Sequence, residues 1–336
     1  SQFRPNESPH KERIPRAFVG QNRRRVTGGR KGIFVSGSLL NSSAGLALVT
    51  IPSEVRWSYF SFAVVLATGL VTIFLRGDWQ RARGFDKLIL LGPLFYAAPL
   101  AGFGTEHFTL TKIIASLIPK WIPWHVFLAY FIGACFITAA LSLVTRIQAR
   151  LAASLVALAF FLFVVLMDVP GWARNPGNRF AAALALRELS FSGGALALAA
   201  SLSGAGCERC KRIAATIARY FIAIPVLFYS VEQFLHADHV PGIPLEMVTP
   251  QWVFGHAIWT YLTAVVYAIA GPLLLIGKKT RAAATILGAT VLLGILVVYV
   301  PIAVVGRADL ECFNYMADTL MYGGTFLLLA GAMAQE

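Results

Sequence analysis

The sequence predicts an all-α polytopic integral membrane protein with about ten transmembrane helices. Apolar residues make up 57% of its 336 residues and charged residues only 13%, whereas about a quarter of a typical soluble chain is charged. Uncharged windows such as 57–75 and 282–305 are long enough to cross a hydrocarbon core of about 30 Å as helices. A third observation, an internal repeat described below, predicts how these helices are organised.

The apolar segments divide the chain into spans with short connections. The predicted spans are 33–51, 57–75, 88–103, 124–143, 151–168, 181–202, 214–231, 251–276, 282–304 and 315–334. The first span contains Ser, Asn and Gly, so a half-buried or re-entrant segment is an alternative to a full crossing. No soluble domain of useful size remains outside the spans.

The distribution of Lys and Arg predicts the orientation of the spans. Alternate loops carry thirteen basic residues on one side, between Arg76 and Arg281, and seven on the other, between Arg56 and Arg307. The more basic side faces the cytoplasm in most membrane proteins. We therefore expect a bacterial-type inner membrane protein with both termini in the cytoplasm.

The N-terminal arm, residues 1–32, is strongly basic. Residues 1–31 hold nine basic and two acidic side chains. Such an arm binds anionic lipid at about 1 kcal/mol per basic residue, and docking onto a partner protein is the alternative. Nucleic acid is not an expected partner. The candidate contact residues are Arg23, Arg24, Arg25, Arg30 and Lys31.

The sequence contains two copies of a four-helix unit, at 88–202 and 214–336. A linker at 203–213 joins the copies, and an N-terminal hairpin at 33–87 precedes them. "LVTRIQARLAASLVAL" in the first copy matches "LLIGKKTRAAATILGA" in the second, and "FVVLMDVP" matches "ILVVYVP". Each copy has an even number of spans, so the copies are predicted to be parallel, related by an axis along the membrane normal.

Particular residues are expected to superpose between the two copies. We expect His107 to superpose on His239, and His125 on His256. We also expect Glu188 to superpose on Asp318. A Gly-Gly pair in the fourth helix of each copy, at 193–194 and 323–324, predicts close helix contact there.

Each copy has an apolar span that ends in an acidic-His segment, then a Pro-x-Trp before the second span and a basic turn before the third. This pattern resembles the DoxX-like family of four-helix membrane proteins, over about two-thirds of the chain. Members of that family are associated with membrane-bound oxidoreductase systems, including a quinone-linked thiosulfate-oxidising enzyme. The resemblance implies a redox-linked membrane component, with quinone as the possible cofactor.

Polar residues within or beside the spans are the predicted functional residues, because ionisable groups in a span are costly and usually face an interior cavity. We expect two clusters at the outer mouths of the two bundles, serving a quinone or proton site in which His exchanges protons near neutral pH. The alternative is that these groups cap helix ends and pair with one another. The first cluster is Glu106, His107, Arg187 and Glu188, and the second is Asp238, His239 and Asp318.

Two cofactor hypotheses compete with these clusters. Glu232, His236 and His239 recur at i, i+4 and i+7, and two His with one carboxylate can hold iron. His125 and His256 precede two spans at equivalent places, so they are candidate haem ligands or, beside tryptophans, interfacial anchors.

Cys207 and Cys210 form a C-x-x-C beside three basic residues. Positive neighbours favour the thiolate, so thiol exchange or metal binding is one interpretation and an ordinary loop is the other. A closed zinc site needs four ligands, and the chain has no second such pair.

These observations predict a membrane subunit of a larger, redox-linked complex. The alternatives are a structural or anchoring subunit and, less favoured, a small-solute transporter. No nucleotide-binding loop or dinucleotide fingerprint occurs in the sequence.

Overall fold

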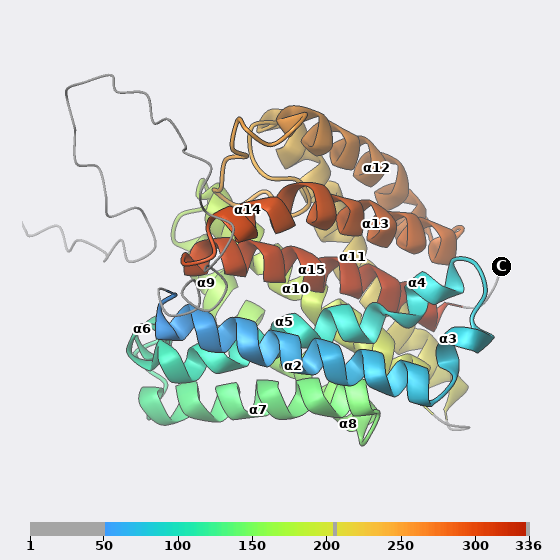
Figure 1. The fold of residues 1–336 in the computed structure, drawn as a ribbon, viewed down its shortest axis with the longest axis horizontal. Coiled ribbons are helices and arrows are strands. Elements are labelled where there is room, and N and C mark those ends of the chain that lie inside the picture. Colours follow the sequence, from blue (N-terminus) through green and yellow to red (C-terminus); the bar gives the residue numbers. More distant parts are fainter. Residues whose placement is uncertain (1–50, 204–206, 334–336) are drawn as a thin grey trace, which may run out of the picture. The chain divides into compact units, whose positions relative to one another are not determined.

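The computed structural model describes residues 51–203 and 207–333 and shows helices connected by short loops (Figure 1). The helices are α2 (Ser53–Leu75), α3 (Asp78–Arg81), α4 (Asp86–Leu90), α5 (Gly92–Thr109), α6 (Thr111–Leu117), α7 (His125–Thr145), α8 (Ala149–Phe163), η1 (Val164–Asp168), α9 (Val169–Ala173), α10 (Arg179–Ser201), α11 (Glu208–Leu235), α12 (His256–Ile276), α13 (Thr280–Gly294), η2 (Ile295–Tyr299), α14 (Val300–Val305) and α15 (Leu310–Ala332). The two η segments are π-helical turns that continue the preceding α-helix.

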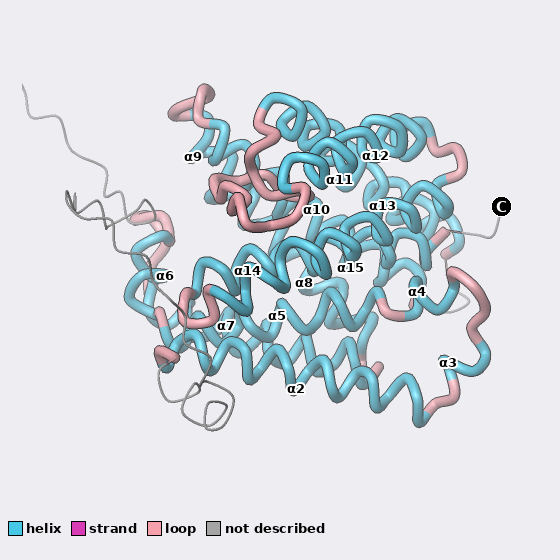
Figure 2. Tube along the Cα trace, turned by 45° about the horizontal axis from the view of Figure 1, so that its top comes forward, coloured by secondary structure: helices cyan, strands magenta, loops and turns pink. Residues whose placement is uncertain are grey.

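Within these residues, eight helices are long and apolar enough to cross a membrane. They match the predicted spans from 57–75 to 282–304, which confirms the fold class. The predicted span 315–334 corresponds to α15, whose 23 residues include the acidic Glu311 and Asp318. Every residue of α15 from 317 to 330 is buried, so this helix contacts protein on all sides. Figure 2 shows α15 among the other long helices.

Some predicted features fall elsewhere. The predicted first span, the basic arm and its candidate contact residues Arg23, Arg24, Arg25, Arg30 and Lys31 lie outside the described residues. The predicted linker 203–213 is shorter than expected, because α11 begins at Glu208. The predicted span 251–276 begins later, at His256, after a loop.

The helix bounds follow the internal repeat. Four elements of the second copy each begin 131 residues after their counterparts in the first: 125 and 256, 149 and 280, 164 and 295, 179 and 310. Even the π-helical turn occurs in both copies. Gln148 and Lys279, which precede the third helix of each copy, both have a left-handed backbone, with φ of 53° and 49°. Because few non-glycine residues adopt this conformation, the same local structure has been built twice.

Contacts at the glycines fix the register between the copies. A Cβ on Gly193 would meet α11, the first helix of the second copy, and a Cβ on Gly324 would meet α5, the first helix of the first copy. Gly194 lies against Thr325, and these two residues are also 131 apart. In this register the counterpart of Asp318 is Arg187, rather than the predicted Glu188.

The two copies share a centre instead of forming two separate bundles. Helices α10 and α15 pack against each other, α5 packs against α7 and α15, and α11 packs against α12 and α10. The first helix of each copy therefore contacts the fourth helix of the other. Helix α2 covers α5 and part of α7. Figure 1 shows the resulting order, with α12 and α7 on opposite flanks of the α10 and α15 pair.

Candidate functional site

The central cluster, which we define as Glu106, Asp168, Arg187, Glu188, Asn314 and Asp318, lies where α5, η1, α10 and α15 meet. Arg187 and Asp318 each lie eight residues beyond the first residue of their helix. At 1.5 Å per residue this is about 12 Å along the helix axis. Arg187 and Asp318 therefore lie within their helices and not at the helix ends.

Arg187 organises the cluster. Its Nη1 donates a hydrogen bond to Asp318 Oδ2 at 2.5 Å, and its Nη2 donates to Glu188 Oε1 at 3.4 Å. The guanidinium group also lies 5.9 Å from the ring centroid of Phe191. Only 17% of the Arg187 side chain and 9% of the Asp318 side chain are exposed. A buried charge needs a partner of this kind, and the pair joins the two copies at equivalent positions.

Glu106 approaches the same place from α5. Asn314, one turn before Asp318 on α15, donates a hydrogen bond from Nδ2 to Glu106 Oε2 at 3.4 Å. Glu106 Oε1 and Asn314 Oδ1 are buried without a hydrogen-bond partner among the described residues. Asn314 was not among the predicted site residues, although a polar residue one turn before Asp318, beside an apolar span, is a signal for it.

Asp168 and Glu188 bring two carboxyl groups together. Asp168 ends the π-helical turn η1, and its carboxyl group lies close enough to that of Glu188 on α10 for the two charges to interact. Asp168 Oδ2 and Glu188 Oε2 are buried without a hydrogen-bond partner among the described residues. Two carboxyl groups this close favour a proton on one of them. Asp168 was not a predicted site residue, because nothing in the sequence indicates that the π-helical turn brings it to α10.

The central cluster thus contains four carboxyl groups and one guanidinium group. A single positive charge cannot balance four carboxylates in a region from which water is largely excluded. The arrangement can hold protons, and it can exchange them if water reaches it.

His107 does not belong to this cluster. Its Nδ1 lies 2.8 Å from the carbonyl oxygen of Phe103, and its ring packs edge-on against Phe136 at 5.6 Å. A Cβ on Gly133 of α7 would touch His107, so the imidazole lies in the contact between α5 and α7. The prediction that His107 joins Arg187 and Glu188 was wrong, because the imidazole packs on another face of α5.

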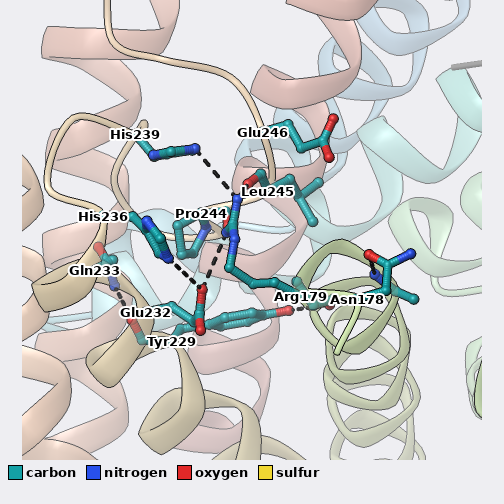
Figure 3. Close-up of polar contacts among 12 residues, drawn as sticks. Asn178, Arg179, Tyr229, Glu232, Gln233, His236, His239, Pro244, Leu245 and Glu246 are labelled. Carbon is teal, nitrogen blue, oxygen red and sulfur yellow. Dashed lines mark hydrogen bonds and ion pairs between the residues drawn. The ribbon is translucent and has the colours of Figure 1, made fainter. Parts of the chain in front are cut away.

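A second group of polar residues, the Arg179 network, lies at the start of α10, two turns before Arg187 (Figure 3). Arg179 donates to Glu232 Oε2 at 3.2 Å and to the carbonyl oxygens of Pro244 and Leu245 at 2.7 and 2.5 Å. Its Nη2 lies 3.4 Å from His239 Nε2. One arginine therefore joins α10, the end of α11 and the loop that follows α11.

That loop, residues 236–255, folds back into the protein. Tyr299 donates to the carbonyl oxygen of Pro241 at 2.6 Å. Gly242 has a φ of +97° and donates its N–H to Gln233 at 3.0 Å. A residue with a side chain would be strained in this backbone conformation. Residues 240–245 are buried. The loop is thus held by side chains of η2, α10 and α11.

Asp238 and His239 lie in this loop and not with Asp318, which corrects the predicted second cluster. His239 Nδ1 lies 3.0 Å from Asp238 Oδ1. The hydrogen bond to His239 holds the pKa of the Asp238 carboxyl below its usual value. Because 64% of the Asp238 side chain is exposed, this pair contributes little to stability.

The predicted iron site is also corrected. Helix α11 ends at Leu235, so His239 is not on the helical face that carries Glu232, and the cation between these two side chains is Arg179. His236 Nε2 is 3.8 Å from Glu232. Among residues 51–203 and 207–333, no group of three or more His, Cys, Asp or Glu could hold a metal ion.

The two candidate haem ligands cannot face each other. His125 and His256 begin α7 and α12, which lie on opposite flanks of the structure (Figure 1). His125 Nε2 is 3.1 Å from the carbonyl oxygen of Pro119, while His256 is exposed. Their equivalent depth therefore follows from the repeat and does not create a shared site.

Comparison of the chain with protein-family models, with curated proteins and with solved structures found no match. The DoxX-like resemblance therefore stays a prediction.

The contacts of Arg179 predict the effect of removing it. Arg179→Ala should release the 236–255 loop and lower the free energy of unfolding by about 2 kcal/mol, because hydrogen bonds from a charged group contribute about 1.5–3 kcal/mol. Hydrogen exchange in detergent should show faster exchange at Gly242 and Met247. Arg174→Ala, which changes an exposed arginine nearby, is the control. Equal exchange in both variants would contradict this role for Arg179.

Proposed function

We propose that the protein is a membrane subunit of a redox-linked complex and that its central cluster takes up and releases protons. The observation that carries the proposal is the ratio of four carboxyl groups to one guanidinium group inside the spans. Protons are the simplest charge that such a cluster can exchange, and buried carboxyl groups form proton relays in many membrane proteins.

The proposed path has a direction. In this path Asp168 and Glu188, which lie side by side, would share a proton. Arg187 holds Glu188 and Asp318, and Glu106 with Asn314 lies one turn nearer the start of α15. In the orientation predicted from Lys and Arg, the start of α15 faces away from the cytoplasm. A proton acquired at this end would therefore be held by Glu106 before it reaches the Asp168 and Glu188 pair. Quinone remains the predicted redox partner on the strength of the DoxX-like resemblance.

The test is infrared difference spectroscopy of the full chain in proteoliposomes. Alternating acidic and neutral buffer should change the C=O stretch of buried protonated carboxyl groups. Glu188→Gln should remove about one carboxyl group's share of this signal while the protein still inserts into the membrane. Glu311→Gln, which changes an exposed carboxyl group at the start of α15, should leave the buried signal intact. A signal unchanged in Glu188→Gln would contradict the proposal.

A structural or anchoring subunit is the second candidate. The Arg187–Asp318 ion pair, which joins the two copies at equivalent positions, favours it. Under this alternative, Glu188→Gln lowers the thermal stability of the complex without removing any pH-dependent carboxyl signal. Native purification with mass spectrometry and a visible spectrum would then identify the partner subunits and any bound cofactor. The same measurement would test the lipid-binding and partner-docking interpretations of the basic arm.

A further inference from the structure

Cys207 and Cys210 form a disulfide at the first turn of α11, with their Cα atoms 5.1 Å apart. Cys207 is the N-cap residue of this 28-residue helix, and its sulfur accepts a hydrogen bond from the Cys210 N–H at 3.1 Å. Both cysteines are exposed. A reagent can therefore reach the disulfide without any movement of the helices.

The disulfide forms part of the wall of a cavity of about 550 Å³ between the start of α8, the end of α10 and the start of α11. Its polar lining comes from Arg150, Ser154, Ser203 and Lys211, in addition to the two cysteines. The volume is in the range of small-molecule sites. Lys211 also pairs with Glu208 at 2.6 Å, which leaves Arg150 as the cation across the cavity from the disulfide.

The position favours reduction of the disulfide. The N-terminal end of a helix carries partial positive charge, which stabilises a thiolate. Arg209 and Arg212 add positive charge beside the two sulfurs, while Lys211 is offset by Glu208. A disulfide whose reduced form is stabilised in this way accepts electrons readily.

We propose that Cys207 and Cys210 form a reversible dithiol–disulfide site that exchanges electrons with a small thiol carrying carboxylate groups. A first substrate thiolate attacks one sulfur of the protein disulfide, so that a mixed disulfide forms and the other cysteine leaves as a thiolate. A second substrate thiolate attacks the substrate sulfur of the mixed disulfide and releases the substrate disulfide. Two substrate thiols are oxidised and one protein disulfide is reduced to two thiols, with the protons passing to the cysteines or to water.

The cavity selects the substrate in this proposal. Carboxylates of the bound thiol would interact with Arg150, which lines the cavity. The chemistry also runs in reverse, because thiol–disulfide exchange is symmetrical. On the predicted cytoplasmic side, excess thiol would keep the pair reduced. The oxidation state of the two cysteines would then follow the ratio of thiol to disulfide in the surrounding small-molecule pool.

The experiment compares two probes, mercaptosuccinate with two carboxylates and uncharged 2-mercaptoethanol. The oxidised full-length protein in detergent is mixed with each probe, and the free thiols are trapped with an alkylating reagent and counted by mass spectrometry. An oxidised peptide of sequence GAGCERCKR, residues 204–212, corrects for the intrinsic reactivity of each probe. The rate with mercaptosuccinate, divided by the rate with 2-mercaptoethanol, should be about fivefold higher for the protein than for the peptide. One favourable charge interaction at a surface has about this effect.

The variants separate the cavity from the motif. Arg150→Gln should bring the rate ratio down to that of the peptide, while Lys278→Gln, which changes an exposed lysine outside the cavity, should not. Cys207→Ser should end the exchange and keep α11 folded, since serine is a good N-cap residue. A rate ratio equal to that of the peptide would overturn the proposal. So would reduction by a protein dithiol such as thioredoxin with no advantage for either small thiol.

Discussion

Replacing Arg187 by alanine is expected to destabilise the helical core by about 3–5 kcal/mol, the usual cost of leaving one member of a buried ion pair without its partner. Asp318 would lose its cation, and the two central helices α10 and α15 would lose the ion pair between them. Thermal unfolding in detergent, followed by circular dichroism or by tryptophan fluorescence, should show a clearly lower midpoint than that of the native chain.

A double variant provides the control for this prediction. Arg187→Met combined with Asp318→Leu removes both charges and fills a similar volume, and such replacements are often neutral or stabilising. The double variant should therefore recover most of the stability lost in Arg187→Ala. If it is as unstable as the single variant, then side-chain shape at this position matters more than charge.

Gly324→Ala is expected to have the second large effect. The added Cβ would lie 2.7 Å from the backbone nitrogen of Tyr96 and 2.9 Å from the carbonyl carbon of Phe95. Because these are backbone atoms of α5, relief requires the whole helix to move away from α15. Overpacking of this kind costs about 1–3 kcal/mol, and the unfolding midpoint should fall accordingly.

Gly331→Ala is the matched control on the same helix. A Cβ there would meet only Ile89 Cγ2, at 3.4 Å, which is an ordinary contact, and glycine in a helix interior is less favourable than alanine by about 0.5–1 kcal/mol. This variant should be neutral or slightly stabilised. Equal losses in the two variants would contradict the close approach of α5 to α15 as the cause.

The sequence predicts the spans well because the signal is local. A run of apolar residues long enough to cross the membrane determines that a helix such as α7 or α13 exists, whatever surrounds it. The close contact at Gly194 and Gly324 was also predicted, since paired small residues let helix backbones approach. The bounds of α7, α8, α10 and their counterparts then follow from the repeat.

The partners of each helix could not be predicted in the same way. Helices that are apolar on most faces carry little information about which neighbour they contact, so the exchange of α5 and α11 between the two copies has no local signal. The same reason explains the misplaced residues. Arg179 is held by groups 53 to 66 residues away in the chain, and no pattern around position 179 indicates them.

The register of the repeat was mistaken for a related reason. The Gly-Gly pairs align 193 with 323, but the contacts align 193 with 324. A one-residue difference rotates a helical position by about 100°. It therefore decides whether Asp318 is matched with Glu188 or with Arg187.

The ion pair between equivalent positions also bears on how such a molecule can arise. In a dimer of identical subunits, a residue beside the two-fold axis faces its own copy, so the position of Arg187 and Asp318 would hold two arginines or two aspartates. Opposite charges at that place are possible only when the two halves have separate codons. In this single polypeptide the two equivalent positions are encoded separately, so one half supplies the cation and the other supplies the anion.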